Sequence, residues 1–151
     1  MGRREIAGRS VEANLAKNPV GFDRQIQSIK TAGGRLCAFF LNDNDADGHD
    51  VSWIYDVDFE RIANTPGLVA FVGGTRAHDM QVRLKYAGID AAIISNIEQA
   101  NGDVTDEEAG DTFYAVANYT AFPPLVMELD ELKGTDASSV ASHAVTRADG
   151  S

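Results

Sequence analysis

The sequence has a single cysteine among its 151 residues, Cys37, which lies inside the apolar run at 36–41. One cysteine excludes an internal disulfide and a zinc site built on cysteines, and a thiol in such a run is usually core filler rather than a nucleophile. Long apolar runs are lacking too. None approaches the roughly 20 residues that span a bilayer, and the start MGRREIAGRS has no apolar stretch of a signal peptide. We therefore expect a cytoplasmic protein without a membrane span.

Basic residues are scarce: 13 Lys and Arg stand against 23 Asp and Glu, for a formal net charge of −10. Nucleic acids and anionic membranes are polyanions and gain nothing from an acidic ligand. We therefore expect no nucleic-acid partner, and instead a basic surface on a partner protein or a cation. The length and the 44% hydrophobic content suit one domain with a real core.

Short apolar runs alternate with segments of helical spacing, and glycine or proline separates them. Expected strands are 4–7, 11–16, 36–41, 68–72, 91–94 and 113–117. Expected helices are 22–31, 59–63, one from about 80 to 86 or 87, a short one capped by Ser95 with Glu98, and a last one opened by Pro123-Pro124 with Val126, Leu129 and Leu132 inward. The alternation predicts an α/β fold with a mostly parallel, Rossmann-like sheet and helices on both faces.

Residues 41–60, LNDNDADGHDVSWIYDVDFE, place seven carboxylates and the only tryptophan directly after a predicted buried strand, where α/β proteins usually have their sites. The first half matches a calcium-binding EF-hand loop, through Asp43, Asp45, Asp47 and Gly48. The second half does not: the bidentate glutamate position is Ile54, and the water-bridging position is Val51. A strand rather than a helix also enters the loop, so calcium is disfavoured.

Asp50 differs from the other carboxylates because apolar and aromatic residues follow it and would hold it at the edge of a structured surface. A carboxylate fixed in this way can accept a hydrogen bond from an imidazolium or meet a basic surface. His143 falls in the tail and His49 is adjacent, so His78 is the histidine of this chain expected to reach it. No serine or usable cysteine accompanies the pair. Asp50 therefore either works with groups from another chain or is structural.

Two turns could contact an anion. Gly73-Gly74-Thr75-Arg76 lies between a strand and a helix, where free backbone N–H groups and an arginine suit an anion. Lys17-Asn18-Pro19 follows another strand and could contact a phosphate. A tight turn and a plain strand end explain the two patterns equally well, and Arg83 and Lys85 are most simply a solvated helix face.

Four segments together resemble a known family: LAKNPVGF (15–22), the acidic segment 41–60, GGTRAHDMQVRLKYAG (73–88) and NYTA (118–121). In this order they resemble the C-terminal domain of the MurT family, the Mur-ligase-like subunits of bacterial lipid II isoglutaminyl synthase. More distantly, the strand leading into KNPVGF is similar to the first strand of the third domain of Mur ligases, where an Asn-Pro motif lies near the nucleotide. The resemblance implies a Mur-ligase C-terminal-like domain over 1–133, and the polar composition beyond it predicts a disordered tail over 134–151.

The resemblance implies a part in a C–N bond-forming ligase of peptidoglycan biosynthesis, and so in cell wall and cell shape. The reaction implied is ATP-dependent amidation of the D-glutamate of lipid II to D-isoglutamine, with glutamine as nitrogen donor. The implied partner is a GatD-type glutaminase subunit, which brings a nucleophilic cysteine and its histidine. The third member of that triad would be supplied in trans by the aspartate after Asp-Gly-x, here Asp50. It would fix the tautomer of the partner histidine and stabilise its imidazolium.

The chain departs from the family in having no GxxxxGK[ST] loop for ATP and no Cys-x-x-Cys pairs for a zinc ribbon. We therefore expect an excised domain, inactive alone, in which ATP and Mg serve the complete subunit and no metal is bound. The residues expected to approach nucleotide or substrate there are Lys17, Asn18, Thr75 and Arg76. Two alternatives stay open: a cation-binding module using Asp43, Asp45 and Asp47, and a nucleotide-binding α/β module using the GGTR turn.

Overall fold

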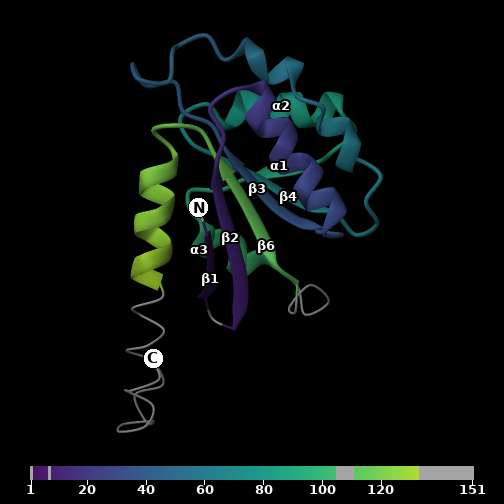
Figure 1. Ribbon diagram of the computed structural model, residues 1–151, viewed down its shortest axis with the longest axis vertical. Helices are drawn as coiled ribbons and strands as arrows, with labels where there is room; N and C mark the ends of the chain where they lie inside the picture. The colour runs from purple at the N-terminus through teal and green to yellow at the C-terminus, as the bar shows by residue number, and fades with distance from the viewer. Residues whose placement is uncertain (1, 7, 105–110, 133–151) are drawn as a thin grey trace, which may run out of the picture.

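The computed structural model describes residues 2–6, 8–104 and 111–132. Within these ranges the chain forms a six-stranded sheet of order β1-β2-β6-β3-β4-β5 (Figure 1). The strands are β1 (Gly2–Ile6), β2 (Arg9–Leu15), β3 (Leu36–Phe40), β4 (Val69–Gly73), β5 (Ala91–Ile93) and β6 (Phe113–Ala117). β1 pairs antiparallel with β2, through a turn in which Gly8 has φ 79°, and the other four pairings are parallel. The predicted mostly parallel α/β sheet is confirmed.

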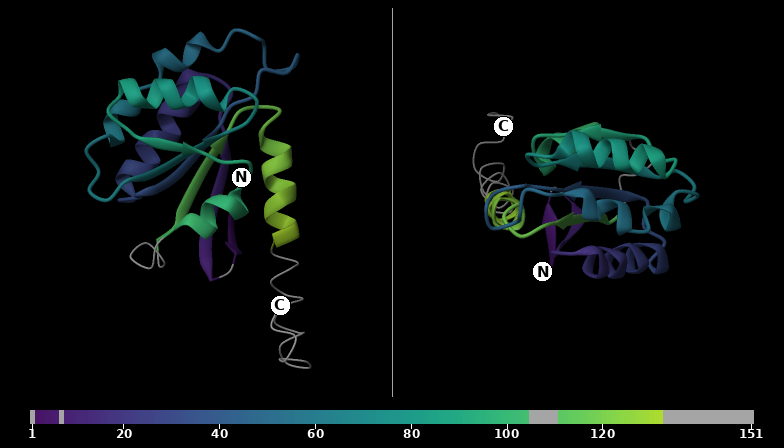
Figure 2. Two further views of the ribbon diagram at one scale, coloured as in Figure 1. Left: turned by 180° about the vertical axis from the view of Figure 1, so that it is seen from behind. Right: turned by 90° about the horizontal axis from the view of Figure 1, so that it is seen from above.

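Helices cover both faces of the sheet (Figure 2). On one face lie α1 (Pro19–Thr31), α2 (Ala77–Tyr86) and two short 3₁₀ helices, η1 (Ser52–Asp56) and η2 (Phe59–Ile62). On the other lie α3 (Ile97–Asp103) and a helix that includes residues 122–132, here called the last helix. The central strand β3 is buried throughout because its side chains alternate between the two cores: Phe39 packs on the first face and Phe40 on the second.

Cys37 also belongs to the first core, as its place in the apolar run predicted. Its side chain is fully buried, and desolvation raises the pKa of its thiol to about 12. The thiolate is the reactive form of cysteine, so this residue is not a nucleophile at neutral pH.

Two helix starts differ from the prediction. The first helix begins at Pro19 rather than at about residue 22, because the Asn18 side chain accepts a hydrogen bond from Gly21 N–H at 2.9 Å and proline fits the first turn. The predicted Ser95 cap is wrong, since Asn96 is the N-cap of α3 and accepts from Gln99 N–H at 2.8 Å. That helix then continues through the Asn101-Gly102 pair at which it was expected to stop.

The last helix contacts the second core through a stripe shifted from the predicted one. Leu129 is fully buried and Leu132 packs against the core, as expected. Val126 is only half-buried, however, and Leu125 takes the inward place instead. The predicted tail, 134–151, lies outside the described residues, and so does His143.

Arg83 was interpreted as part of a solvated helix face, which is wrong: it is 4% exposed, whereas Lys85 is exposed as expected. Its Nε donates to the Ile54 carbonyl at 3.0 Å and its Nη2 to the Val57 carbonyl at 2.6 Å. Both guanidinium Nη atoms also donate to the carboxylate of Glu60, at 3.0 and 3.1 Å, and hold the pKa of Glu60 below its usual value. Irregular turns leave carbonyls with few backbone donors: Ile54 O accepts one backbone bond, from Val57 N–H at 3.3 Å. The five N–H donors of arginine can satisfy several such groups at once. Arg83 thus fixes the segment 52–60 against α2.

Replacing Arg83 with Met is expected to lower the free energy of unfolding by about 2–4 kcal/mol, because the Val57 carbonyl loses its donor, the Ile54 carbonyl loses one of two, and Glu60 loses its ion pair. Urea denaturation of the chain measures the change. Lys85→Met, on the same helix but at an exposed position, is the control and should change stability by no more than about 0.5 kcal/mol. Equal stability of the two variants would show that Arg83 does not hold the segment.

Candidate functional site at the carboxyl edge of the sheet

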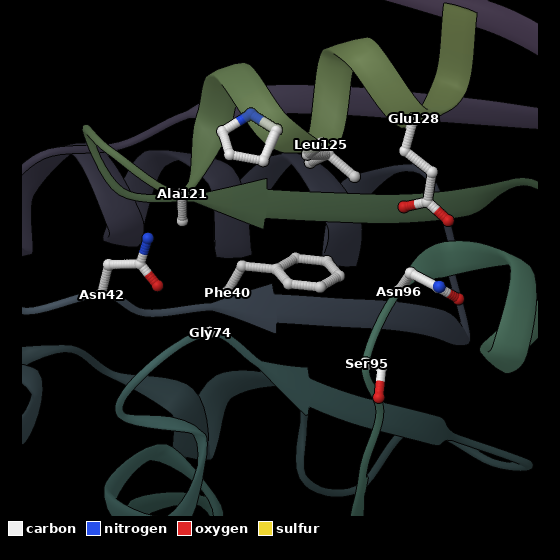
Figure 3. Close-up of a pocket in the computed structure, with 9 residues that line it drawn as sticks. Phe40, Asn42, Gly74, Ser95, Asn96, Ala121, Leu125 and Glu128 are labelled. Atoms are coloured by element: carbon white, nitrogen blue, oxygen red, sulfur yellow. The ribbon is translucent and has the colours of Figure 1, made fainter. Parts of the chain in front are cut away.

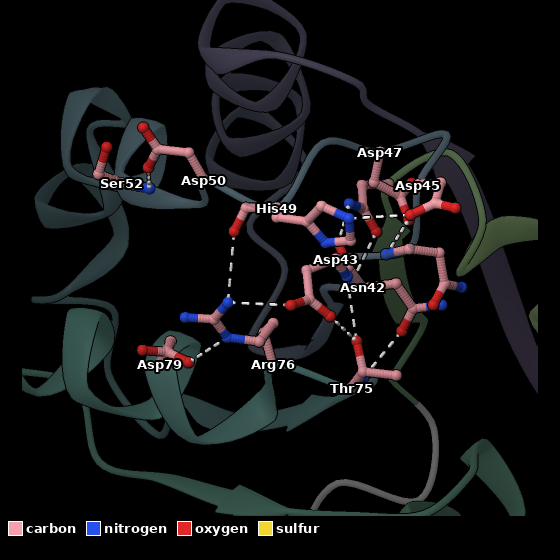
Figure 4. Close-up of polar contacts among 12 residues, drawn as sticks. Asn42, Asp43, Asp45, Asp47, His49, Asp50, Ser52, Thr75, Arg76 and Asp79 are labelled. Carbon is pink, nitrogen blue, oxygen red and sulfur yellow. Dashed lines mark hydrogen bonds and ion pairs between the residues drawn. The ribbon is translucent and has the colours of Figure 1, made fainter.

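The candidate site residues gather at the carboxyl ends of the parallel strands (Figure 4). After β3 the chain passes to the face covered by η1 and η2, whereas after β6 it passes to the face covered by the last helix. β3 and β6 are neighbours, so the crevice beyond their ends is a topological switch point, where α/β folds commonly bind ligands.

That crevice is closed by a reciprocal pair of asparagines. Asn42 N–H donates to the side-chain oxygen of Asn118 at 2.9 Å, and the Asn118 side-chain amide donates back to the Asn42 carbonyl at 2.9 Å. Asn118 is 3% exposed, so these bonds satisfy a buried amide and extend the β3–β6 pairing beyond the strands. Asn118 was not among the predicted site residues, although its segment was noted.

Asp47 ties the acidic segment to the loop after β6. Its Oδ1 accepts from Thr120 N–H at 2.8 Å, and its Oδ2 accepts from the Thr120 hydroxyl and from Asn44 N–H at 3.1 Å. Asn44 also donates its side-chain amide to the Thr120 hydroxyl at 2.9 Å. Asp47 therefore has a structural role, which the three bonds to its carboxylate explain.

Asp43 is bound to the turn after β4. Thr75 Oγ1 donates to one carboxylate oxygen at 2.9 Å and Arg76 Nη1 donates to the other at 3.0 Å. Arg76 Nε contacts Asp79 at 2.6 Å. Gly74, at φ 94°, makes this approach possible, because a Cβ there would collide with the Leu41 carbonyl oxygen. Two carboxylates thus neutralise Arg76, which weakens the GGTR turn as an anion site.

The carboxylates of the partial EF-hand match do not converge. Asp43 contacts Arg76, Asp47 contacts Thr120, and Asp45 contacts His49 Nε2 at 2.9 Å. Over residues 2–6, 8–104 and 111–132, no three His, Cys, Asp or Glu side chains lie close enough to hold a metal ion. The geometry therefore offers no support for the cation-binding alternative.

Asp50 stands apart from this network (Figure 4). It is exposed. Its Oδ1 accepts a hydrogen bond at 2.9 Å from the backbone N–H of Ser52, which is the first residue of η1. The hydrogen bonds from the side chain and backbone of Ser52 hold the pKa of the Asp50 carboxyl below its usual value. No other bond to Asp50 is formed within the described part of the chain. The carboxylate remains accessible to solvent.

The structure does not bring His78 to Asp50. His78 is exposed on the first turn of α2 and lines a pocket of about 320 Å³ with Lys85 and Asp90. His49 adjoins Asp50 in sequence, but its ring contacts Asp45 instead. Among the described residues, then, no histidine partners the Asp50 carboxylate.

Lys17 lies at the end of β2 with its ammonium 5.5 Å from the centre of the Tyr119 ring. The two residues line a pocket of about 240 Å³ together with Ala46, Asp47 and Asn118. No carboxylate in the described ranges forms an ion pair with Lys17. Of the four predicted nucleotide- or substrate-binding residues, Lys17 keeps an uncompensated charge, whereas Asn18 caps α1 and Thr75 and Arg76 bind Asp43. Tyr119, which belongs to the segment 118–121 but was not a predicted site residue, is the added member of this group.

A second pocket, of about 300 Å³, opens beside the switch point between β3 and the last helix (Figure 3). Its lining includes Phe40, Asn42, Asn96 and Glu128. The Glu128 carboxylate accepts from Ile97 N–H and Glu98 N–H, both at 2.9 Å, and so satisfies the first turn of α3. The charged group of this pocket is thus already engaged.

Comparison with known proteins identifies the family. The family described as MurT ligase C-terminal matches residues 15–122. The chain belongs to the MurT ligase C-terminal family. Curated relatives include the MurT subunit of lipid II isoglutaminyl synthase (glutamine-hydrolyzing) from Staphylococcus aureus, 39% identical over 120 residues, which cover 78% of this chain and 27% of that protein. The Streptococcus pneumoniae MurT subunit is 36% identical over 127 residues, 80% of this chain and 28% of that protein.

The chain therefore spans about a quarter of the length of these MurT relatives. Among solved structures, folylpolyglutamate synthase from Thermotoga maritima aligns with a TM-score of 0.48 at 16% identity, covering 89% of this chain and 30% of that one. No helix within the described ranges is long and apolar enough to cross a membrane.

In this member of the MurT ligase C-terminal family, the segments that carried the resemblance meet in space. Segment 15–22 leaves β2, 41–60 leaves β3, 73–88 leaves β4 and 118–121 leaves β6, all at the carboxyl edge. The asparagine pair and Asp47 join the second segment to the fourth, and Asp43 joins it to the third. The acidic segment is therefore fixed by its own polar contacts, with Asp50 left outside them.

The ion group around Arg76 predicts a pH dependence of stability. Thr75 and Arg76 lower the pKa of Asp43, and Arg76 lowers the pKa of Asp79. A carboxyl with a lower pKa in the folded state than in the unfolded chain stabilises the fold above about pH 4 and loses this contribution as pH falls through the folded pKa. Asp43→Asn should therefore lower stability at pH 7 and shrink the loss between pH 7 and pH 3, as measured by urea denaturation.

Asp90→Asn is the control, because Asp90 is exposed and makes no bond within the described ranges. Its pH profile should follow that of the wild type. An Asp43→Asn profile parallel to the wild-type one would contradict the assigned role of the ion group.

Proposed function

We propose that this chain is the C-terminal domain of an ATP-dependent, glutamine-hydrolysing lipid II isoglutaminyl synthase, which amidates the D-glutamate of the peptidoglycan stem peptide. In this proposal the domain docks a GatD-type glutaminase subunit and supplies Asp50 to its catalytic triad. Family membership and the names of the MurT relatives support the reaction. The subunits would act in the cytoplasm, where the precursor's stem peptide is accessible.

The observation that carries the role of Asp50 is its geometry. It is an exposed, ionised carboxylate oriented by Ser52, and no histidine of the described residues partners it. The bond to Ser52 N–H, two residues on, is an Asx turn, which orients the carboxylate locally. A triad aspartate needs a defined orientation, because it must present one oxygen to an imidazole N–H.

In the complex, the free oxygen of Asp50 accepts a hydrogen bond from one ring N–H of the partner histidine. This bond leaves the other ring nitrogen unprotonated and aimed at the nucleophilic cysteine, from which it takes the thiol proton. The negative charge of Asp50 then stabilises the imidazolium that forms. Asp50 stays ionised throughout, consistent with its lowered pKa.

ATP and Mg belong to the complete subunit in this proposal. The described residues fit part of a nucleotide or substrate contact, since Lys17 beside Tyr119 offers a cation and an aromatic face at the sheet edge. They do not fit a metal site. Asn18, Thr75 and Arg76 would shape this edge through the contacts they already make, and Lys17 would bind a phosphate or carboxylate group directly.

Asp50→Asn in the complete complex should reduce glutamine hydrolysis and glutamine-dependent amidation by about 10³- to 10⁴-fold, the loss typical of a triad carboxylate. Amidation with ammonium as nitrogen source should be unchanged, because it bypasses the glutaminase. Complex formation should also persist, since asparagine keeps the shape of the side chain. Coupled assays with each nitrogen source measure the split.

The matched control is Asp45→Asn, an exposed aspartate five positions earlier in the same segment, which should retain normal turnover. Near-normal glutaminase activity in Asp50→Asn, or an equal loss in Asp45→Asn, would refute the role of Asp50.

Lys17→Ala should raise the KM for ATP or for the lipid II substrate about 10- to 100-fold, the value of a hydrogen bond to a charged group. Glutaminase turnover should not change, because the partner carries that chemistry. Lys85→Ala is the control at an exposed position on α2. Unchanged KM values for both substrates in Lys17→Ala would remove Lys17 from the site.

A further inference from the structure

Two exposed tyrosines form a contact on the surface of the domain. Tyr55 in η1 is 52% exposed and Tyr86 at the end of α2 is 76% exposed. Their ring centres lie 6.2 Å apart at an interplanar angle of 63°. The rings meet edge to face, and no other two exposed aromatic side chains within the described ranges contact each other. Paired exposed aromatics are uncommon on a free surface and common at protein interfaces.

The packing beneath the pair keeps it outside. The Arg83 guanidinium lies 5.5 Å from the centre of the Tyr55 ring, and its bonds to the Ile54 and Val57 carbonyls fill the space below. Tyr55 therefore cannot turn inward without displacing a buried charge. The Tyr55 ring therefore stays exposed and accessible to a partner protein.

The pair and Asp50 lie along one seam, where segment 49–57 meets α2. Asp79, Arg83 and Tyr86 share one face of that helix, at spacings i, i+4 and i+7. At one end Asp79 binds Arg76, whose Nη1 reaches the His49 carbonyl next to Asp50 at 3.4 Å. In the middle Arg83 binds the segment, and at the other end Tyr86 meets Tyr55.

The length of the seam decides what a partner at Asp50 must cover. Seven helical residues span roughly 10 Å. A typical interface buries about 800 Å² on each protein, equivalent to a disc about 16 Å in radius. A partner patch of that radius, centred near Asp50 and extending along the seam, would cover the tyrosine pair as well.

The charge at the pair indicates the chemistry of the partner. Asp56 ends η1, one residue after Tyr55, and is exposed. Arg83 neutralises Glu60 and Arg61 contacts Asp58, whereas Asp56 has no ion pair within the described ranges. The surface thus offers two aromatic rings and one uncompensated carboxylate.

We propose that Tyr55, Asp56 and Tyr86 form the docking surface for the glutaminase subunit. The matching face of that subunit is apolar, with a lysine or arginine placed to meet Asp56. This inference rests on the proposed function, since it takes the protein that completes its triad with Asp50 as the occupant. The surface binds the partner, and Asp50 serves the chemistry.

The test compares Tyr86→Ser and Tyr86→Arg with Met127→Ser and Met127→Arg in the full-length subunit. Met127, on the last helix and 62% exposed, is the matched control. Calorimetry with the purified glutaminase should show a Kd raised about 10-fold for Tyr86→Ser and more for Tyr86→Arg, as for an interface aromatic. Both Met127 variants should bind like the wild type.

A second measurement needs no substitution. Oxidative footprinting of the wild-type complex should show Tyr55 and Tyr86 protected by the partner and Tyr119 unchanged. Raising the salt concentration should weaken binding, and Asp56→Asn should reduce that dependence.

The outcomes separate this inference from the proposed function. Wild-type Kd values for Tyr86→Arg, or unprotected tyrosines in the complex, would overturn the docking surface, while a loss of turnover in Asp50→Asn would still uphold the triad role. Normal turnover in Asp50→Asn would instead refute the triad role, and the Kd values would still decide whether the tyrosines bind the partner.

Discussion

The hydrogen bonds from Arg83 to backbone carbonyls of segment 52–60 fix the surface that includes Asp50. Segment 52–60 contains two 3₁₀ helices, and two of its carbonyls need donors from outside: Ile54 O has one local bond, from Val57 N–H at 3.3 Å, and Val57 O receives its bond from Arg83. Arg83 supplies the donors from α2, and Glu60 balances its charge. Because the segment is fixed in this way, η1 begins at a defined place, and Ser52 N–H can orient Asp50. The outward direction of one carboxylate thus depends on a buried guanidinium on another element.

At the carboxyl edge of the sheet, polar groups also find partners within the domain, and there their bonds close the crevice. Its switch point, where related folds admit ligands, is closed by Asn42, Asn118, Thr120 and Asp47. The carboxylates that looked available for a cation are engaged with Arg76, Thr120 and His49. Lys17 beside Tyr119 and Asp50 beside Ser52 are left with free polar atoms, and the proposed functions fall on them.

The sequence predicted the sheet well because apolar runs mark the strands and glycine or proline residues mark where they end. The apolar runs predicted all six strands to within two residues at each end, with β1 and β2 both shifted toward the start of the chain. Helix ends were less accurate where two polar residues competed for a cap, as Ser95 and Asn96 did. The burial of Arg83 could not be predicted, because it depends on a bond to the carbonyl of Ile54, 29 residues away in the chain. Helical spacing carries no information about such distant partners. The asparagine pair was missed for the same reason, since its members are 76 positions apart.

The central claim is that Asp50 accepts a hydrogen bond from a histidine of another chain. The pKa of that histidine tests the claim directly. This pKa can be followed by NMR in the glutaminase subunit alone and in complex with the full-length subunit. A nearby carboxylate favours the imidazolium, so the wild-type complex should raise the histidine pKa by about one unit or more, and the Asp50→Asn complex should not. Equal histidine pKa values in the two complexes would contradict the account.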